Sequence, residues 1–242
     1  MVAVTGKVAV VTGGRRGLGA ALVDELLARG ARKIYSTGRS SYVDERPEVV
    51  TVELNVRSEE SVAALAKAAP DAEIVFNNAG VMVPEPLLGG GLETAVETFD
   101  VNVFGLLRVA RAFAPVMAAH DGGALVNMHS VLSWLGGGGA YGASKAAAWS
   151  VTNSLRVELA SQNTQVVGVH AGFIDTDMAA GVDGEKISPQ SVAQQMVAAI
   201  EADAEEVLAD PTSELVKASL SNDLTTLYPA LQAQWDAELV SR

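Results

Sequence analysis

The stretch Lys7-Val-Ala-Val-Val-Thr12-Gly-Gly-Arg-Arg-Gly-Leu-Gly19 decides the fold of this chain of 242 residues. Its first part, from Lys7 to Thr12, is short, apolar and rich in β-branched residues, which predicts a strand. Residues 20–29 carry apolar side chains at helical spacing, and Gly30 follows as a stop signal. A strand, a glycine-rich turn and a helix in this order are the context that a dinucleotide-binding site requires.

The glycines of the turn give this site its expected geometry. Gly13 permits a tight turn. Gly17 and Gly19 let the backbone approach a pyrophosphate and let the helix pack closely on the strand. The amino terminus of the helix adds N–H groups and the positive end of its dipole. We therefore expect Gly13 and the run Gly17-Leu18-Gly19 to bind the phosphates of a dinucleotide.

Strand and helix signals alternate along nearly the whole chain. This alternation predicts an α/β fold, here a Rossmann-type doubly wound parallel sheet of about seven strands with helices on both faces. The length suits one such domain over residues 1–242, with amphipathic stretches that predict a helical C-terminal extension over residues 211–242. The strands expected after the first cover residues 33–37, 49–53, 74–76, 124–130, 165–170 and 206–210.

Tyr141 and Lys145 carry the chemistry that we expect. Four residues apart on a predicted helix, they share a face, so the phenol and the ammonium can point into one cleft. The same spacing also occurs in a helix whose Tyr is buried and whose Lys reaches into solvent. A nearby ammonium favours the phenolate, and lowering the pKa of a phenol by about three units from ~10 takes roughly 4 kcal/mol. The result is a group that can protonate a forming alkoxide. Ser130, at the end of an apolar strand, and the glycine loop 136–139 lead into the same helix.

Three motifs together resemble the short-chain dehydrogenase/reductase family. They are the Gly-x-x-x-Gly-x-Gly turn, Asn77-Asn78-Ala79-Gly80 after the strand 74–76, and the set of Ser130, Tyr141 and Lys145. Their order and approximate spacing match the family from residue 7 to about residue 178.

The resemblance implies roles for individual residues. Ser130, Tyr141 and Lys145 would do the chemistry, and Asn102 would be the fourth catalytic residue. The residues placed at the cofactor, besides the glycine turn, are Asn55, Val56, Asn78, Ala79, Gly80, Tyr141, Lys145, Gly172, Ile174 and Thr176.

Three features depart from the family's usual pattern. Asn55 stands where an Asp is common, so the expected adenine contact keeps a carbonyl and loses a charge. Ala171 replaces the usual Pro. The interval between Ser130 and Tyr141 is a little shorter than usual. Ser133 is therefore an alternative to Ser130 as the catalytic serine, and Ser130 is favoured because it follows the strand directly.

The choice of nicotinamide depends on the residues after the second strand, which ends in Gly38-Arg39. A site that prefers NAD usually carries an Asp or Glu there for the ribose 2′-OH, and none is present. Arg39 and Arg16 instead bracket the expected position of a 2′-phosphate, whereas Arg15 is expected to point into solvent. One charge-assisted hydrogen bond to phosphate contributes about 1.5–3 kcal/mol, so we expect NADP(H) as the cofactor.

The composition narrows the function classes. A net charge of −12 argues against nucleic acid as a partner, because its phosphates would be repelled. No cysteine is present and the three histidines are scattered, so we expect no metal site. Neither a signal peptide nor a transmembrane stretch is recognised, which favours the cytoplasm and no membrane partner. His129 stays open as a residue that faces either the cleft or the other side of the sheet.

The sequence therefore favours an NADPH-dependent carbonyl reductase, which transfers hydride between the nicotinamide and a ketone or aldehyde. One alternative is an NADP-linked alcohol dehydrogenase that works in the oxidative direction. The other is a non-catalytic NADP-sensing protein of the same fold.

The substrate site is expected to form from residues 130–145 and 172–190. Its apolar walls favour a small hydrophobic molecule and are Val131, Leu132, Trp134 and Met178. We expect a homodimer or homotetramer. Leu231, Trp235 and Leu239 would pack against the body of the domain or against a partner.

Overall fold

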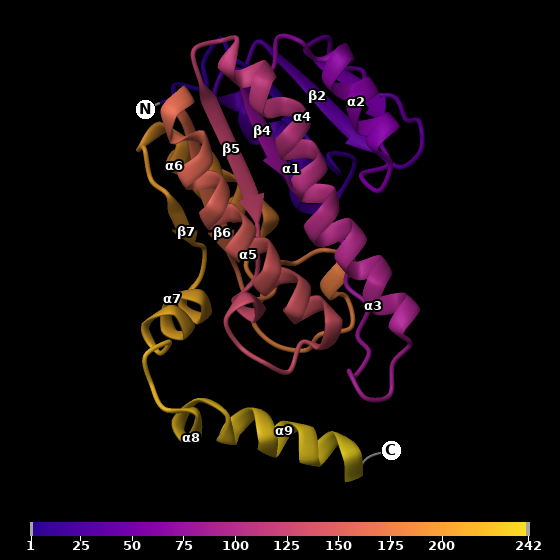
Figure 1. Cartoon of the computed structure of the whole chain (residues 1–242), viewed down its shortest axis with the longest axis vertical. Helices are drawn as coiled ribbons and strands as arrows, with labels where there is room; N and C mark the ends of the chain where they lie inside the picture. Colours follow the sequence, from indigo (N-terminus) through magenta and orange to yellow (C-terminus); the bar gives the residue numbers. More distant parts are fainter. Residues whose placement is uncertain (1, 241–242) are drawn as a thin grey trace.

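A computed structural model describes residues 2–240 of the chain (Figure 1). Its strands are β1 (Val8–Val11), β2 (Lys33–Gly38), β3 (Val49–Glu53), β4 (Ile74–Asn77), β5 (Gly123–Met128), β6 (Thr164–His170) and β7 (Glu206–Leu208). They form one sheet in the order β3-β2-β1-β4-β5-β6-β7, and all neighbouring strands are parallel. The expected Rossmann-type sheet in a single domain is confirmed.

Helices cover both faces of the sheet. One face packs against α1 (Gly17–Ala28) and α6 (Pro189–Glu201), and the other against α2 (Glu59–Ala68), α4 (Leu106–Ala118) and α5 (Gly139–Leu159). The other helices described are α3 (Leu92–Phe99), α7 (Pro211–Ala218), α8 (Leu224–Leu227) and α9 (Pro229–Val240). Short irregular turns are η1 (Asp100–Gly105), η2 (Val131–Ser133), η3 (Ala160–Gln162) and η4 (Asp177–Ala179).

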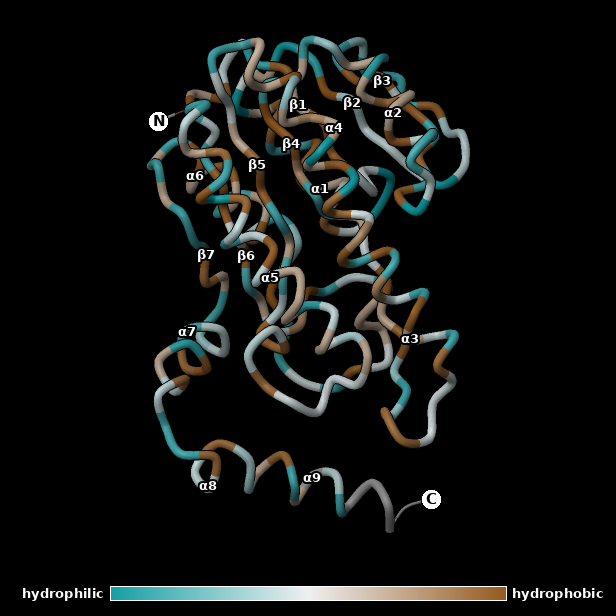
Figure 2. Tube along the Cα trace, viewed as in Figure 1, coloured by the Kyte–Doolittle hydropathy of each residue, from teal (hydrophilic) through white to brown (hydrophobic). Residues whose placement is uncertain are grey.

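Two hydrophobic cores lie on the two faces of the sheet. In β1, Ala9 and Val11 belong to the core with α1 and α6, whereas Val8 and Val10 belong to the core with α2, α4 and α5. A strand that is buried on both faces reads as a continuous apolar run, which is why no polar residue interrupts it. Figure 2 shows this hydrophobic character along the central strands.

The sheet changes winding direction at β1, which pairs with β2 on one side and with β4 on the other. In open α/β sheets, ligands bind in the crevice outside the carboxyl ends of the strands at such a switch point. Gly13 follows β1 and Asn78 follows β4, so both motifs lie at this crevice.

Two irregular turns lie at the same carboxyl edge. β5 ends at Met128, and Ser130 then caps η2, where its Oγ accepts the N–H of Leu132 at 3.2 Å. Between α3 and α4, the helix widens into the π-helical turn η1, which contains Asn102. Turns of this kind occur mostly as single bulges at functional sites. Both deviations therefore coincide with residues for which we expect a catalytic role.

The C-terminal extension is helical and lies beyond the carboxyl edge of the sheet (Figure 1). Tyr228 joins it to the glycine loop, because its hydroxyl accepts the N–H of Gly136 at 3.2 Å. Leu231 is half-buried, whereas Trp235 is 40% exposed. The side chain of Leu239 lies outside the described residues. The extension thus contacts the body near the expected substrate loop.

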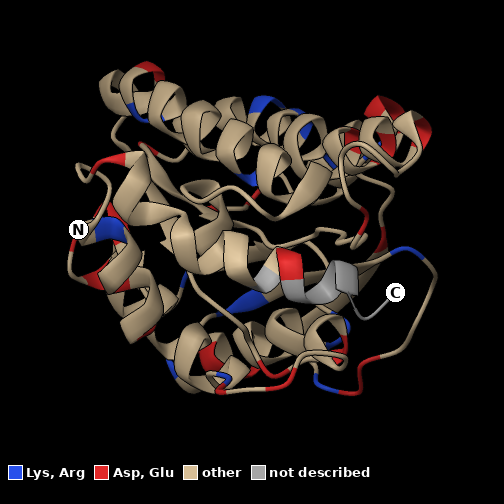
Figure 3. Cartoon of the chain, turned by 90° about the horizontal axis from the view of Figure 1, so that it is seen from below, with Lys and Arg blue, Asp and Glu red and all other residues tan. Residues whose placement is uncertain are grey.

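The helix from Leu92 to Ala118 is apolar enough to span a membrane by length and composition, with a mean hydropathy of 1.4. In the fold, 44% of that window is buried, and the α4 part packs against the sheet. Core helices of α/β domains meet the same criteria. Acidic residues occur on several separate elements in Figure 3. The absence of a membrane or nucleic-acid partner stays a prediction.

Candidate active site

The glycine-rich turn has the backbone conformation that its residues permit. Gly13 and Gly17 have φ angles of 70° and 55°, in the left-handed region that favours glycine. α1 begins at Gly17, so its first N–H groups, which lack partners within the helix, lie beyond the carboxyl end of β1. The Thr12 hydroxyl accepts the N–H groups of Asn78 and Ala79, both at 3.0 Å. This side chain ties the turn to the Asn-Asn-Ala-Gly segment.

Replacing Gly19 with Ala is expected to disrupt the turn. A Cβ at this position would lie 2.0 Å from the carbonyl oxygen of Gly13 and 2.8 Å from the side chain of Asn78. Because the nearer atom belongs to the backbone, the turn must shift, and overpacking of this kind costs about 1–3 kcal/mol. Unfolding by denaturant and calorimetric titration with NADPH would measure the losses of stability and affinity.

Gly181→Ala is the matched control for this substitution, because a Cβ there would meet no atom within 4 Å. Equal affinity and equal stability of the two variants would contradict the close approach at Gly19.

Arg15 lies nearer than Arg16 to the loop that follows β2. Its guanidinium donates to the Ser40 hydroxyl at 2.9 Å and lies 5.6 Å from the centre of the Tyr42 ring. Arg15 is exposed, as expected from the sequence, and it also contacts the loop that follows β2. Arg16 instead pairs with Asp177 at 2.8 Å, on the η4 side of the turn.

Arg39, directly after β2, is exposed. It makes no hydrogen bond or ion pair with any other residue in the part of the chain that the structure describes. The guanidinium is thus available to an anion. Arg39 directly precedes Ser40, and Arg15 donates to the Ser40 hydroxyl, so two positive charges lie at this end of the crevice.

Asn55 and Val56 follow β3 at the same end of the crevice. The Asn55 side-chain carbonyl accepts the N–H of Arg57 at 3.1 Å. Its own turn thus fixes this side chain and leaves the NH₂ group to face other partners. The contact with adenine stays a prediction for both residues.

The segment after β6 lies over the other end of the turn. The γ-methyl group of Thr176 would meet a Cβ on Gly17 at 3.2 Å, which brings Thr176 against the glycine turn. The N–H of Gly172 donates to the Asp210 carboxylate at 2.6 Å. Ile174 forms an isolated bridge with Ile187, so the segment 172–190 closes on itself as a short loop.

Tyr141 and Ser130 meet at the carboxyl edge of the sheet. Tyr141 lies in the first turn of α5, and Ser130 caps η2. Burial raises the pKa of Tyr141, and a hydrogen bond with the Ser130 hydroxyl opposes part of that rise. Ser133 has a different task, because its hydroxyl accepts the N–H of Ser130 at 3.4 Å. Of the two serines, Ser130 is the one that acts on the phenol.

Lys145 does not bring the pKa of Tyr141 below its usual value in this geometry, which corrects the expectation from sequence. Its Nζ atom donates to the carbonyl oxygen of Met128 at 2.8 Å and lies 5.7 Å from the centre of the Tyr141 ring. The phenolate would be desolvated, and this cost decides the sign of the shift at Tyr141. Burial also lowers the pKa of Lys145 to about 8, so the amine is mostly charged at pH 7.

Asn102 holds the active-site helix to the segment after β4. Its Oδ1 accepts the N–H of Val81 at 2.9 Å, and its Nδ2 donates to the Val81 carbonyl at 2.9 Å. The same Nδ2 donates to the Ser144 hydroxyl at 3.0 Å. Ser144 precedes Lys145 in α5, and Lys145 Nζ would lie 3.7 Å from a Cβ on Gly80. These contacts bring Asn102 and Lys145 next to the segment after β4, which contains Gly80 and Val81.

A buried chain of hydrogen bonds beneath the site was not expected from the sequence. Asn77 donates to Asn127 at 2.9 Å, and Asn127 donates to the Thr152 hydroxyl at 2.9 Å. The chain links β4 and β5 to α5, which carries Tyr141. An Asn in the middle of the apolar run 123–128 was the available signal, because buried polar groups need partners.

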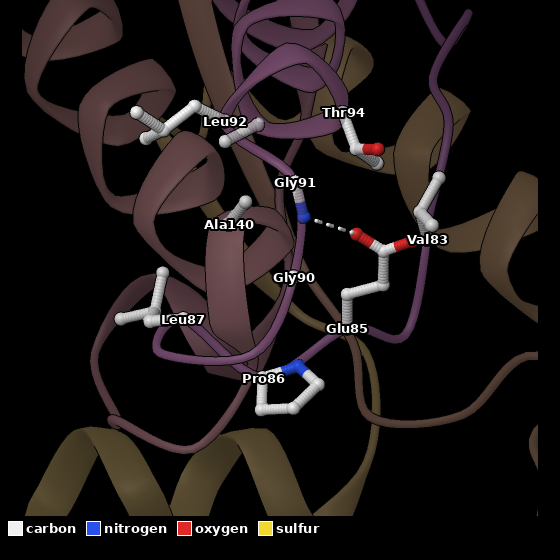
Figure 4. Close-up of a pocket in the computed structure, with 10 residues that line it drawn as sticks. Val83, Glu85, Pro86, Leu87, Gly90, Gly91, Leu92, Thr94 and Ala140 are labelled. Atoms are coloured by element: carbon white, nitrogen blue, oxygen red, sulfur yellow. Dashed lines mark hydrogen bonds between the residues drawn. The ribbon is translucent and has the colours of Figure 1, made fainter.

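The loops around α5 form shallow pockets. One lies between the loop after β4 and the start of α3 (Figure 4), where Glu85 accepts the N–H of Gly91 at 3.3 Å. Its lining is Val83, Glu85, Pro86, Leu87, Gly90, Gly91, Leu92, Thr94, Ala95 and Ala140. Of the expected walls, Leu132 and Trp134 line a second pocket along the glycine loop, and Met178 is 47% exposed in η4.

His129 does not face the open cleft. Its side chain is 1% exposed, and its ring centre lies 5.0 Å from that of His170. Burial, followed by the neighbouring His170, lowers the pKa of His129 well below its usual value.

The model of the short chain dehydrogenase family matches residues 7–186. The chain belongs to this family. The match includes the glycine turn, the Asn-Asn-Ala-Gly segment and all four residues with an expected catalytic role. The resemblance seen in the sequence is thereby confirmed at the level of the family, and a short-chain dehydrogenase is an oxidoreductase.

Similar proteins support this short-chain dehydrogenase assignment. A 3-oxoacyl-[acyl-carrier-protein] reductase of Synechocystis is 31% identical over 202 residues, which cover 77% of this chain and 82% of that protein. A short-chain dehydrogenase of Burkholderia cenocepacia in complex with NADP superposes with a TM-score of 0.90 at 37% identity, over 95% of this chain and 99% of that one. A short-chain dehydrogenase/reductase of Burkholderia phymatum in complex with NAD superposes with a TM-score of 0.80 at 26% identity, over 91% of this chain and 93% of that one.

Proposed function

We propose that this short-chain dehydrogenase is an NADPH-dependent carbonyl reductase. The observation that carries the proposal is a partly buried phenol, Tyr141, beside the Ser130 hydroxyl and the Lys145 ammonium. Because its pKa is raised, the phenol keeps its proton at pH 7. A protonated donor is what the reduction of a carbonyl needs, whereas oxidation of an alcohol needs the phenolate.

The residues of the crevice fit a dinucleotide phosphate. The positive φ angles at Gly13 and Gly17, and the lack of room for a Cβ at Gly19, bring the backbone close to where a pyrophosphate would lie. The amino terminus of α1 supplies N–H donors. Arg39 and Arg15 would hold the 2′-phosphate that distinguishes NADPH from NADH.

The three polar side chains divide the work on the carbonyl group. When bound, NADPH supplies the hydride for the carbonyl carbon. The Tyr141 hydroxyl donates its proton to the oxygen as negative charge develops there. Ser130 donates a hydrogen bond to the same oxygen and stabilises that charge. The Lys145 ammonium stabilises the phenolate that remains. One hydride and one proton thus convert the carbonyl to an alcohol.

Replacing Arg39 with Ala is expected to lower the preference for NADPH over NADH by about tenfold or more. The variant loses a charge-assisted bond worth about 1.5–3 kcal/mol to the 2′-phosphate, which NADH does not have. The ratio of kcat/KM for NADPH and NADH measures the effect.

The control for Arg39→Ala is Arg111→Ala, because Arg111 is an exposed arginine on α4 and its loss changes the net charge equally. Arg15→Ala and Arg16→Ala then show which neighbour shares the phosphate. The ion pair of Arg16 with Asp177 would have to open first. An unchanged ratio in the Arg39 variant would remove the basis for NADPH.

The substrate that we propose is a hydrophobic ketone or aldehyde, because apolar side chains line the loops beside α5. The reductase relative acts on 3-oxoacyl groups according to its name, so acyl thioesters belong in any test. The oxidative alternative uses the same residues at higher pH. The non-catalytic alternative gives Tyr141 and Lys145 no task.

The deciding experiment is consumption of NADPH and NADH by the purified protein with a panel of ketones, aldehydes, 3-oxoacyl thioesters and alcohols. We expect turnover of apolar carbonyl compounds with NADPH well above turnover with NADH. Binding of NADPH without turnover of any member would favour the non-catalytic alternative. Turnover of alcohols alone across pH 6–9 would favour the oxidative one.

A further inference from the structure

His170 lies at the end of β6, behind the catalytic edge, and its side chain is fully buried. Its Nδ1 atom lies 3.2 Å from the carbonyl oxygen of Ser130. A carbonyl oxygen only accepts hydrogen bonds, so the imidazole must donate from Nδ1. Neutral His170 therefore carries its proton on Nδ1 and a lone pair on Nε2. This Nε2 has no hydrogen-bond partner within the described part of the chain.

Aromatic and charged neighbours fix the orientation of the His170 ring. The indole of Trp134 stacks on it, with centres 3.8 Å apart and planes inclined by 16°. Lys217 Nζ lies 4.9 Å from the centre of the Trp134 ring and pairs with Glu206 at 2.8 Å. Glu206 lies 3.9 Å from His170 Nε2, and the His129 ring lies on the β5 side. The imidazole is therefore held on several sides and cannot turn freely.

The Ser130 backbone lies where the sheet gives way to the turn η2. β5 has ended at Met128, and the Ser130 carbonyl accepts the N–H of Ser133 at 3.0 Å. Its second lone pair receives His170. Among the side chains described, His170 is the one that bonds this carbonyl. The direction of the Ser130 hydroxyl depends on this backbone, because a serine hydroxyl is one rotatable bond away from it.

We propose that His170 is a positioning residue, which aims the Ser130 hydroxyl at the phenol and at the substrate oxygen through the Ser130 carbonyl. The inference rests on the proposed reductase function. Trp134 stacks on His170, and Lys217 of α7 contacts the Trp134 ring. The C-terminal extension therefore helps to hold His170 in place without touching substrate.

The donor is available over the whole working range of pH. Burial lowers the pKa of His170 to about 4, although the bond to Ser130 opposes part of this shift. The imidazole is therefore neutral above about pH 5, and its proton stays on Nδ1. His170 acts as a fixed donor and not as a proton carrier, since no substrate atom can reach a fully buried ring.

The first test reads the tautomer of His170 directly and needs no substrate. The chain has three histidines, so ¹⁵N-histidine labelling gives a simple NMR spectrum, and His120→Gln and His170→Asn assign the signals. We expect the Nδ1–H form for His170 between pH 6 and 8. His120, whose Nε2 lies 3.0 Å from the carbonyl of Pro70, should show the opposite tautomer and is the internal reference. An Nε2–H form at His170 would overturn the proposal.

The second test compares His170→Leu with His170→Asn. Leu removes the donor, whereas the Asn amide can donate from nearly the position of Nδ1. We expect kcat to fall about tenfold in the Leu variant and to stay within about twofold in the Asn variant, which corresponds to one hydrogen bond. The affinity for NADPH should stay unchanged in both.

The pH profile separates positioning from mere filling of the core. The Ser130 hydroxyl holds the pKa of Tyr141 down, so a displaced hydroxyl should let that pKa rise. The alkaline limb of the reductive kcat should therefore move upward in His170→Leu, as in Ser130→Ala, and stay in place in His170→Asn. Equal profiles and equal kcat in wild type and His170→Leu would disprove positioning. If the wild-type protein reduced no carbonyl compound, the proposed reductase function would be wrong. The NMR test of the His170 tautomer would still show whether His170 donates to the Ser130 carbonyl.

Discussion

Tyr141→Phe is expected to lower kcat for carbonyl reduction by about 10²–10⁴-fold, the usual contribution of a positioned general acid. Phe keeps the ring and its packing but cannot donate a proton to the developing alkoxide. The burial that raises the pKa of Tyr141 shows that the phenol is protonated at pH 7, so the wild-type enzyme has a proton to lose by this change. Single-turnover oxidation of NADPH, followed by absorbance, measures the effect on the chemical step.

Tyr35→Phe is the matched control for Tyr141→Phe. Tyr35 is a buried tyrosine in β2, and its hydroxyl donates to Asp71 at 2.9 Å, away from the crevice. The control should keep kcat, and both variants should bind NADPH as the wild type does. A Tyr141→Phe enzyme that turns over at the wild-type rate would mean that water or another residue supplies the proton.

The sheet could be predicted from the sequence because its strands are buried on both faces. Such strands are short apolar runs between glycine or polar breaks, and β3 lies at residues 49–53 as expected from the sequence. Boundaries next to the site were less accurate. The run 124–130 was expected to be a strand to its end, but β5 stops at Met128. The side chains of Ser130 and Ser133 bond the backbone there and form a cap, while the N–H groups of His129 and Val131 still donate to the carbonyl oxygens of Val169 and Ala171.

The sequence locates the candidate site, but it does not predict the hydrogen bonds and ion pairs of the site residues. Spacing puts Tyr141 and Lys145 on one helix face, because i and i+4 positions always share one. It does not say that Lys145 reaches the Met128 carbonyl, or that Arg16 pairs with Asp177, since both depend on rotamers and on distant segments. The sign of the Tyr141 shift was missed for the same reason. The closeness of Lys145 in the sequence suggested that its charge would lower the pKa of Tyr141, whereas burial in the fold is the largest effect and raises that pKa.

Lys145→Met is expected to remove most reductase activity and, at the same time, to stabilise the fold at neutral pH. Burial lowers the pKa of Lys145 from 10.5 to about 8, which corresponds to about 3 kcal/mol of cost for the buried ammonium. Met fills a similar volume without charge. The Met128 carbonyl loses its donor, which takes back about 1 kcal/mol and leaves a net gain of about 2 kcal/mol. Urea unfolding at pH 7 measures this gain, and NADPH oxidation measures the loss of activity.

The dependence on pH distinguishes this cause from better packing. Below pH 8 both the folded and the unfolded state hold the Lys145 proton, so the wild type carries the full cost. Between about pH 8 and 10.5 the folded state loses its proton first, and wild-type stability rises with pH. The advantage of Lys145→Met should therefore shrink over this range and become a loss of about 1 kcal/mol above it, because the Met128 carbonyl still lacks its donor. Lys67→Met, at an exposed lysine on α2, should change little at any pH. A gain that persists unchanged at high pH would come from packing. A loss of stability at pH 7 would show instead that the folded site favours the charged amine, and Lys145 would then be a structural residue as well as a catalytic one.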